Sequence, residues 1–207
     1  MKAWELFHPF VVPDVMGCPN PLVDHALRQA AREFCQRSSV WREWADSFTA
    51  TGLLQRFDFD LPGQAELVAA TRATVAGKGI QVLGSHFLPA DWQLTDTTFT
   101  SDALIHISMT EYMLYPMPSA GEVVSIEMAL KPSLTASGVG DDVYNKWAEV
   151  VSKGALYRLL SSPGKPYTDL QAAALSKSVF ESGVHAAAND QWRQTAANGR
   201  RVKKAAL

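Results

Sequence analysis

Two stretches decide the fold of this chain. Residues 18–37 read CPNPLVDHALRQAAREFCQR, and residues 154–167 read GALYRLLSSPGKPY. In the first stretch, Asn20 is a good N-cap and Pro21 falls at the first helical position, where its missing N–H costs nothing. Apolar residues then recur at three- and four-residue spacing as one stripe: Val23, Leu27, Ala30, Ala31 and Phe34. This pattern predicts a helix over 20–39.

The second stretch lies within a region, 141–192, that predicts two helices. Asp141 or Asp142 can cap the first of them, and apolar residues follow at near-helical spacing through Leu159 and Leu160. The two prolines and the glycine of 163–166 must end that helix. Thr168 or Asp169 then caps a last helix, which we expect to persist to about Trp192.

Between the helical regions the hydrophobic period changes to two. Phe57 and Phe59 alternate with Asp58 and Asp60, as in a half-buried strand. Residues 77–79, GKG, lie between two apolar runs and predict a hairpin. Further runs at 103–109, 112–114 and 123–130 predict a meander. About six strands result, enough for a small sandwich or barrel-like unit in a β-rich insertion over 40–132.

The two ends of the chain have distinct compositions. Residues 1–19 carry Trp4, Phe7 and Phe10 among prolines, which predicts an extended arm whose aromatic side chains lie on the same subunit or on a neighbour. The last residues, 190–207, carry a formal charge of +4 in a chain of net charge −2, which leaves −6 for 1–189. The basic residues form the tail of 193–207: Arg193, Arg200, Arg201, Lys203 and Lys204. Such a tail is either an electrostatic docking segment or a solvated helix end.

The expected fold class is therefore α+β. A helical bundle, with one N-terminal helix and two C-terminal helices, carries a β-rich insertion, an extended N-terminal arm and a C-terminal tail. At 207 residues the chain suits one domain.

The net charge of −2 excludes wholesale attraction of the chain to nucleic acid. A run of about 18 apolar residues, as a membrane helix needs, does not occur in the sequence, and the N-terminus does not read as a signal peptide.

Catalytic motifs are weak. The five histidines are scattered, the glycines form no phosphate loop and the serines form no nucleophile elbow. Asp58 and Asp60 alternate like a metal-binding pair, but a solvated strand face is the stronger interpretation. Cys35 falls on an apolar helix face, which favours a buried thiol. We therefore expect no catalytic residue, no cofactor and no bound metal.

The two helical blocks together resemble the head-to-tail adaptor (connector) proteins of tailed bacteriophages. The resemblance covers both helical parts and the strand that enters the second, around half of the chain. It is carried by an ordered set of residues: Cys18-Pro19 and Pro21, Val23, Ala26-Leu27-Arg28, Ala30-Ala31, Glu33-Phe34-Cys35, Val40-Trp41, Ala129-Leu130-Lys131-Pro132-Ser133, Gly154-Ala155-Leu156, Arg158-Leu159-Leu160, Lys165-Pro166-Tyr167, Phe180 and Gly183-Val184.

The resemblance implies a structural protein of the virion neck. Copies would assemble as a ring, twelve-fold to match a portal, after synthesis in the host cytoplasm. The C-terminal segment would reach the portal, the aromatic arm would contact an adjacent subunit, and tail or neck proteins would bind the other side. Genomic DNA would pass through the bore without sequence-specific binding.

Alternative functions stay open. Another neck or tail ring protein, such as a tail-tube gatekeeper or a tail terminator, would have the same composition. A small metal-dependent enzyme would use Asp58, Asp60 and a histidine, and a DNA-binding accessory factor would act through the basic tail.

Overall fold

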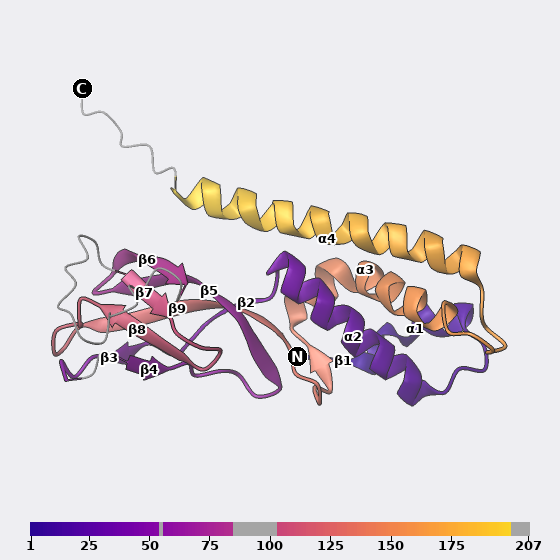
Figure 1. The fold of residues 1–207 in the computed structure, drawn as a ribbon, viewed down its shortest axis with the longest axis horizontal. Helices are drawn as coiled ribbons and strands as arrows, with labels where there is room; N and C mark the ends of the chain where they lie inside the picture. The colour runs from indigo at the N-terminus through magenta and orange to yellow at the C-terminus, as the bar shows by residue number, and fades with distance from the viewer. Residues whose placement is uncertain (54–55, 85–102, 200–207) are drawn as a thin grey trace, which may run out of the picture. The chain divides into compact units, whose positions relative to one another are not determined.

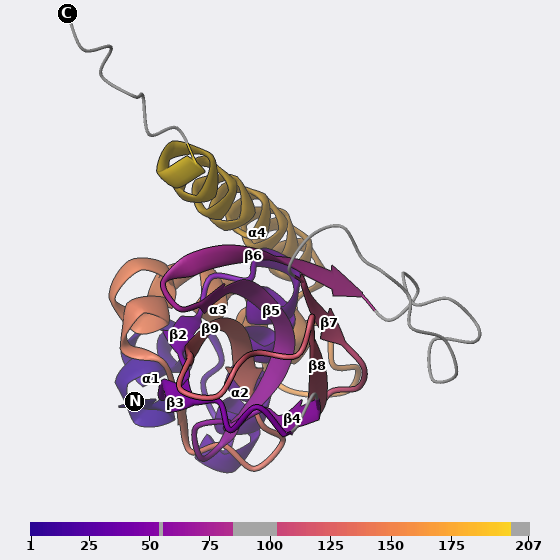
Figure 2. The same ribbon diagram turned by 90° about the vertical axis from the view of Figure 1, so that its left-hand side faces the viewer.

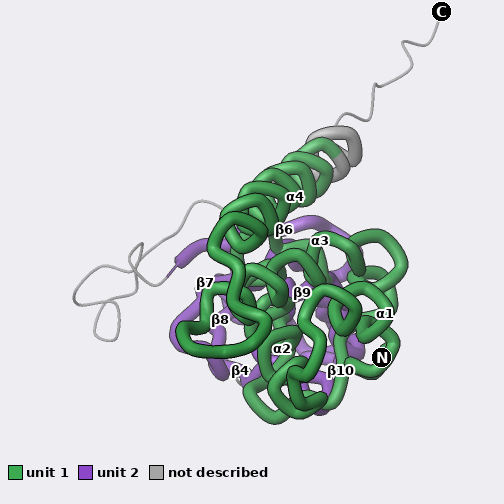
Figure 3. Tube along the Cα trace, turned by 90° about the vertical axis from the view of Figure 1, so that its right-hand side faces the viewer, with its two compact units in different colours: residues 1–41, 131–207 green, residues 42–130 purple. Residues whose placement is uncertain are grey.

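The structure, a computed structural model, describes residues 1–53, 56–84 and 103–199, and side chains as far as Arg193. The chain divides into two compact units (Figure 3). Unit 1 comprises residues 1–41 and 131–207, and unit 2 comprises residues 42–130. The helices that we expected belong to unit 1 and most of the strands to unit 2.

Three long helices pack against one another in the described part of unit 1 (Figure 1). They are α2 (Asn20–Ser38), α3 (Asp141–Leu160) and α4 (Leu170–Gly199). Phe34 of α2 lies fully buried where the three meet, with Trp147 of α3 and Phe180 of α4 as ring neighbours. Gly154 lets α3 and α4 approach closely, because a Cβ there would lie 2.6 Å from the Phe180 ring. The apolar periodicity thus predicted all three helices.

The helix ends follow local chemistry. Ser39 has a left-handed φ of 52° and donates its N–H to the Cys35 carbonyl at 2.8 Å, which ends α2. The Asp169 carboxylate accepts the N–H groups of Gln171 and Ala172, both at 3.0 Å, so the predicted cap of the last helix is confirmed. That helix runs on to Gly199, beyond the Trp192 that we expected.

The expected extended arm is wrong. Residues before α2 form a short strand β1 (Lys2–Ala3), the 3-10 helices η1 (Trp4–Phe7) and η2 (Val12–Asp14), and between them α1 (His8–Val11). Prolines misled the prediction because a proline is tolerated in the first turn of a helix, and Pro9 and Pro13 both sit there. β1 pairs with β10 (Gly138–Val139), which fastens the N-terminus to the same unit.

Eight strands among the described residues make one strongly curled sheet in unit 2 (Figure 2). The order is β2-β9-β5-β6-β7-β8-β4, with β3 also paired to β9. The strands are β2 (Arg42–Trp44), β3 (Phe48–Thr49), β4 (Arg56–Asp58), β5 (Ala65–Val75), β6 (Lys78–Gly84), β7 (Ala103–His106), β8 (Glu111–Tyr115) and β9 (Val123–Pro132). In the end-on view the sheet bends into a half-barrel.

The predicted fold class is therefore corrected. Helices hold 43% and strands 28% of the structure, and the fold is mixed α/β with a large half-barrel rather than a helical bundle with a β insertion. The physical reason is that unit 2 buries its own core, which includes Leu104, Leu114, Val124, Ile126 and Met128. A sheet with a core of that size is an architectural element equal to the helices.

Strand pairing was predicted only where it is local. β5 and β6 form the expected antiparallel hairpin, and both Ala76 and Gly77 adopt positive φ at its turn. β7 and β8 also pair antiparallel. The rest of the meander is wrong, because β9 lies between β2 and β5 instead of beside β8. β6 pairs with β7 in parallel, a pairing that the sequence did not predict.

Candidate functional site

The aromatic residues expected to contact a neighbour have different surroundings. Trp4 is 3% exposed and donates its indole N–H to the Ala136 carbonyl at 2.8 Å. Phe7 is fully buried, with its ring edge-on to Tyr144 at a centroid distance of 5.0 Å. Phe10 is 40% exposed. The same chain covers Trp4 and Phe7, so of the three only Phe10 keeps surface for another subunit.

The predicted docking tail begins on a helix. Arg193 is exposed on α4, and Arg200, Arg201, Lys203 and Lys204 lie outside the described residues. Among the α4 side chains that the structure describes, as far as Arg193, the last buried one is Ala187. Five residues later Trp192 is 73% exposed. The end of α4 therefore presents a large indole beside a guanidinium, with neither of the two side chains buried.

Asp58 and Asp60 lie at an edge of the sheet. Both are exposed, and with the exposed Asp46 they border a small cavity of about 30 Å³. Asp58 on β4 stands directly opposite Glu111 on β8, also exposed. We call Asp46, Asp58, Asp60 and Glu111 the acidic edge. Among the described residues, no group of three or more His, Cys, Asp or Glu side chains is placed to hold a metal ion.

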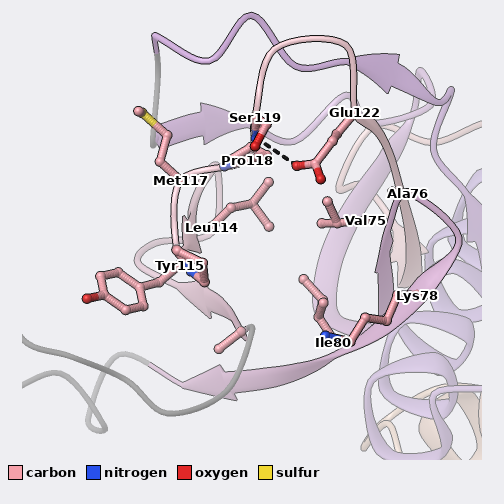
Figure 4. Close-up of a pocket in the computed structure, with 12 residues that line it drawn as sticks. Val75, Ala76, Lys78, Ile80, Leu114, Tyr115, Met117, Pro118, Ser119 and Glu122 are labelled. Carbon is pink, nitrogen blue, oxygen red and sulfur yellow. Dashed lines mark hydrogen bonds between the residues drawn. The ribbon is translucent and has the colours of Figure 1, made fainter.

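The curl of unit 2 encloses a larger pocket of about 400 Å³ (Figure 4). Val75, Ile80 and Leu114 point into it, whereas Tyr115 and Met117 point away. Polar and apolar groups share its exposed lining about equally. Among the polar groups, the Glu122 carboxylate accepts the Ser119 N–H at 2.7 Å, and Lys78 borders the opposite side. Such a mixed lining can contact apolar and charged groups alike.

A buried carboxylate elsewhere in unit 2 has a structural role. Glu127 on β9 is 8% exposed and accepts the Thr71 hydroxyl at 2.7 Å. Arg42 and Arg72 lie 3.7 and 3.6 Å from the same carboxylate oxygen. Burial lowers the pKa of Arg42, while Glu127 opposes that shift. Glu127 thus offsets part of the charge of two arginines and joins β2, β5 and β9 through its carboxylate.

Unit 1 contains a polar groove between α2 and α3. Its volume is about 320 Å³, and we call it the basic groove. Every lining side chain is polar, and three are arginines: Gln29, Arg32, Glu33, Gln36, Arg37 and Arg158. Glu33 joins two of these arginines, since Arg158 Nη2 and Arg37 Nη1 each donate to one of its carboxylate oxygens. The lining therefore holds three cations against one anion.

Arg37 also ties the groove to α4. Its guanidinium donates to both carboxylate oxygens of Glu181, so α2 and α4 share a bidentate ion pair. These hydrogen bonds raise the pKa of Arg37, and the bond from Arg37 lowers the pKa of Glu181. Because Glu181 favours its charged form in the folded state, the pair stabilises the fold at neutral pH, and this contribution is lost as the pH falls through the lowered pKa.

We expect Arg37→Met to raise the pKa of Glu181 toward its ordinary value. The substitution removes the hydrogen bonds that favour the carboxylate form and keeps a long aliphatic stem. NMR titration of side-chain carboxyl carbons measures this directly. Lys146→Met, at an exposed position of α3, is the control variant and should leave the pKa of Glu181 as it is in the wild type. An unchanged Glu181 midpoint would show that the ion pair does not form in solution.

Sequence reasoning missed the basic groove. Gln29, Arg32, Glu33 and Gln36 follow the three- and four-residue spacing of one helix face, so a polar stripe on α2 was visible. Arg158 lies 125 residues from Glu33, and only the packing of α3 on α2 brings them together. Cys35, on the opposite face, is buried as predicted, and burial raises the pKa of its thiol.

Comparisons with known proteins do not assign the chain. No helix in the described ranges is both long and apolar enough to cross a membrane. No protein family model matches the sequence, and no curated protein matches it.

Proposed function

We propose that this protein is a structural subunit of the neck of a tailed bacteriophage, in which a ring of copies joins the portal to the tail. The observation that carries the proposal is on α4 beyond Ala187, where the helix presents exposed Trp192 and Arg193. Tryptophan and arginine are the residues most enriched where protein interfaces concentrate their binding energy. In this proposal they begin the segment that docks on the portal.

Charge supports the same proposal. The basic residues of 190–207 give a segment that suits an acidic docking surface, while 1–189 carries −6. A ring whose subunits are negatively charged over these residues would line a genome channel without binding the phosphate backbone of DNA. Contacts between phosphates and cations would oppose DNA movement. The proposal assigns no catalysis to the chain.

A truncation tests the proposal. We expect the full chain to bind the portal protein of the same phage genome as a ring visible by electron microscopy, twelve-fold if it matches the portal. A chain ending at Asn189 keeps every α4 residue that is buried among the described side chains and should fold, but it should lose portal binding. Trp192→Ala should weaken portal binding by tenfold or more, a loss of about 1.4 kcal/mol or more.

Leu175→Ala is the matched control, because Leu175 is 69% exposed on the same helix but several turns earlier. It should leave the portal affinity unchanged. Failure of the full chain to bind the portal would contradict the proposal, as would equal binding by the truncated chain. Binding to tail-tube proteins alone would instead favour a tail-tube gatekeeper or a tail terminator.

A further inference from the structure

The basic groove is chemically suited to carboxylates from outside its own unit. Its lining has three arginines and one acid, and Lys131 reaches the rim, where it donates to Gln36 Oε1 at 3.2 Å. Glu181, bound to Arg37, is the other acid nearby. Four cations thus face two anions. Arginine binds carboxylates through a planar fork of N–H groups. The groove therefore offers excess positive charge on side chains that can bind a carboxylate with two hydrogen bonds.

Hydrogen-bond donors remain in the groove. A guanidinium has five N–H groups. Arg158 uses Nη1 on the Gly154 carbonyl and Nη2 on Glu33, and its Nε–H has no acceptor among the described residues. Arg37 donates through Nη1 and Nη2, and its Nε–H is likewise without an acceptor in the described part of the chain. The groove can therefore accept a further carboxylate without breaking its internal ion pairs.

The acidic edge supplies such carboxylates. None of its four members forms an ion pair with another described residue, and Asp58 and Glu111 oppose each other across paired strands, where like charges repel. Arg56, two positions before Asp58, is the nearby cation on β4. The net charge of the edge with Arg56 is thus −3. A cation from outside would relieve this repulsion.

We propose that the acidic edge of one copy docks in the basic groove of the next copy. This inference rests on the proposed ring, and it names the contact that closes it. The groove belongs to unit 1 and the edge to unit 2, so each subunit presents one patch of each kind. Such a heterologous, head-to-tail contact generates rings when the rotation closes. The expected contact is carboxylate to guanidinium, with affinity that falls as ionic strength rises.

Charge reversal tests this contact between copies in the absence of portal. Sedimentation velocity over a concentration series at low salt should show self-association of the wild-type chain. Arg37→Glu or Asp58→Lys alone should weaken it by tenfold or more, the usual scale for a close interfacial charge pair. The two substitutions combined in one chain should restore association to within about threefold of wild type, because the exchanged charges at positions 37 and 58 again attract each other.

Matched controls reverse exposed charges outside both patches. Lys146→Glu on α3 and Glu5→Lys in η1 should leave association unchanged. Gln29→Glu is a second groove variant, since it adds an acid without removing any hydrogen bond of the groove, and it should weaken association if Arg37→Glu disturbs folding. Thermal unfolding of each variant separates misfolding from lost contact.

The outcomes distinguish this inference from the proposed function. A wild-type chain that stays monomeric, or a double reversal that fails to restore association, would overturn the inference while portal binding still supports the neck assignment. A groove variant that lowers only portal affinity would also overturn it, and would place the portal at the groove. Charge-dependent association without portal binding would support the contact and contradict the neck assignment.

Discussion

Replacing Phe34 with alanine is expected to lower the free energy of unfolding by about 3–5 kcal/mol. The side chain has no exposed surface. Its ring lies 5.7 Å from that of Trp147 on α3 and 6.4 Å from that of Phe180 on α4, measured between centroids. Alanine would remove contacts on three helices at once and leave a cavity that rigid helix backbones cannot close. Since folded proteins are stable by about 5–15 kcal/mol, this is a large share.

Urea unfolding followed by far-ultraviolet circular dichroism measures the loss. Leu175→Ala is the control, because it removes a similar apolar side chain that is 69% exposed on the outer face of α4. Its effect should stay within about 0.5 kcal/mol. If Phe34→Ala lowers the free energy of unfolding no more than this control does, the three helices do not share a core at Phe34.

The helices were predictable because their signals are local. Stripe periodicity, the break at 163–166 and the cap at Asp169 all lie within a few residues of the structure that they determine. The half-barrel was not, because its order depends on pairs far apart in the chain. β9 fits between β2 and β5, and no pattern within β9 specifies those neighbours. The local pattern therefore recovered the six strands from β4 to β9, but not the short strands β1, β2, β3 and β10, nor the order of the sheet.

The candidate sites were likewise predictable only where they depend on neighbouring residues in the sequence. Alternation along residues 57–60 indicated that Asp58 and Asp60 share a face, yet the repulsion between Asp58 and Glu111 exists only in the register of β4 with β8. The polar stripe of α2 was visible, but Arg158 completes the groove from another helix. A charge cluster assembled from separate elements has no sequence motif. Such a cluster can be identified only when the packing of those elements is known, as is also the case for a catalytic triad built from distant parts of a chain.

Phe7→Ala is expected to lower the free energy of unfolding of the isolated chain by about 3–5 kcal/mol, whereas Phe10→Ala should cost less than about 1 kcal/mol. The two residues lie three positions apart and lose the same atoms. Phe7 is fully buried against Tyr144 and Trp4, while Phe10 is 40% exposed. Urea unfolding of both variants as monomers decides where the N-terminal segment packs.

Equal small losses in the free energy of unfolding would mean that the segment leaves its own subunit in solution and that a neighbour covers Phe7. A large loss in the free energy of unfolding for Phe7→Ala alone would show that the N-terminal segment packs on the helices of its own subunit. Phe10 would then be the aromatic side chain of this segment that is able to contact a second copy.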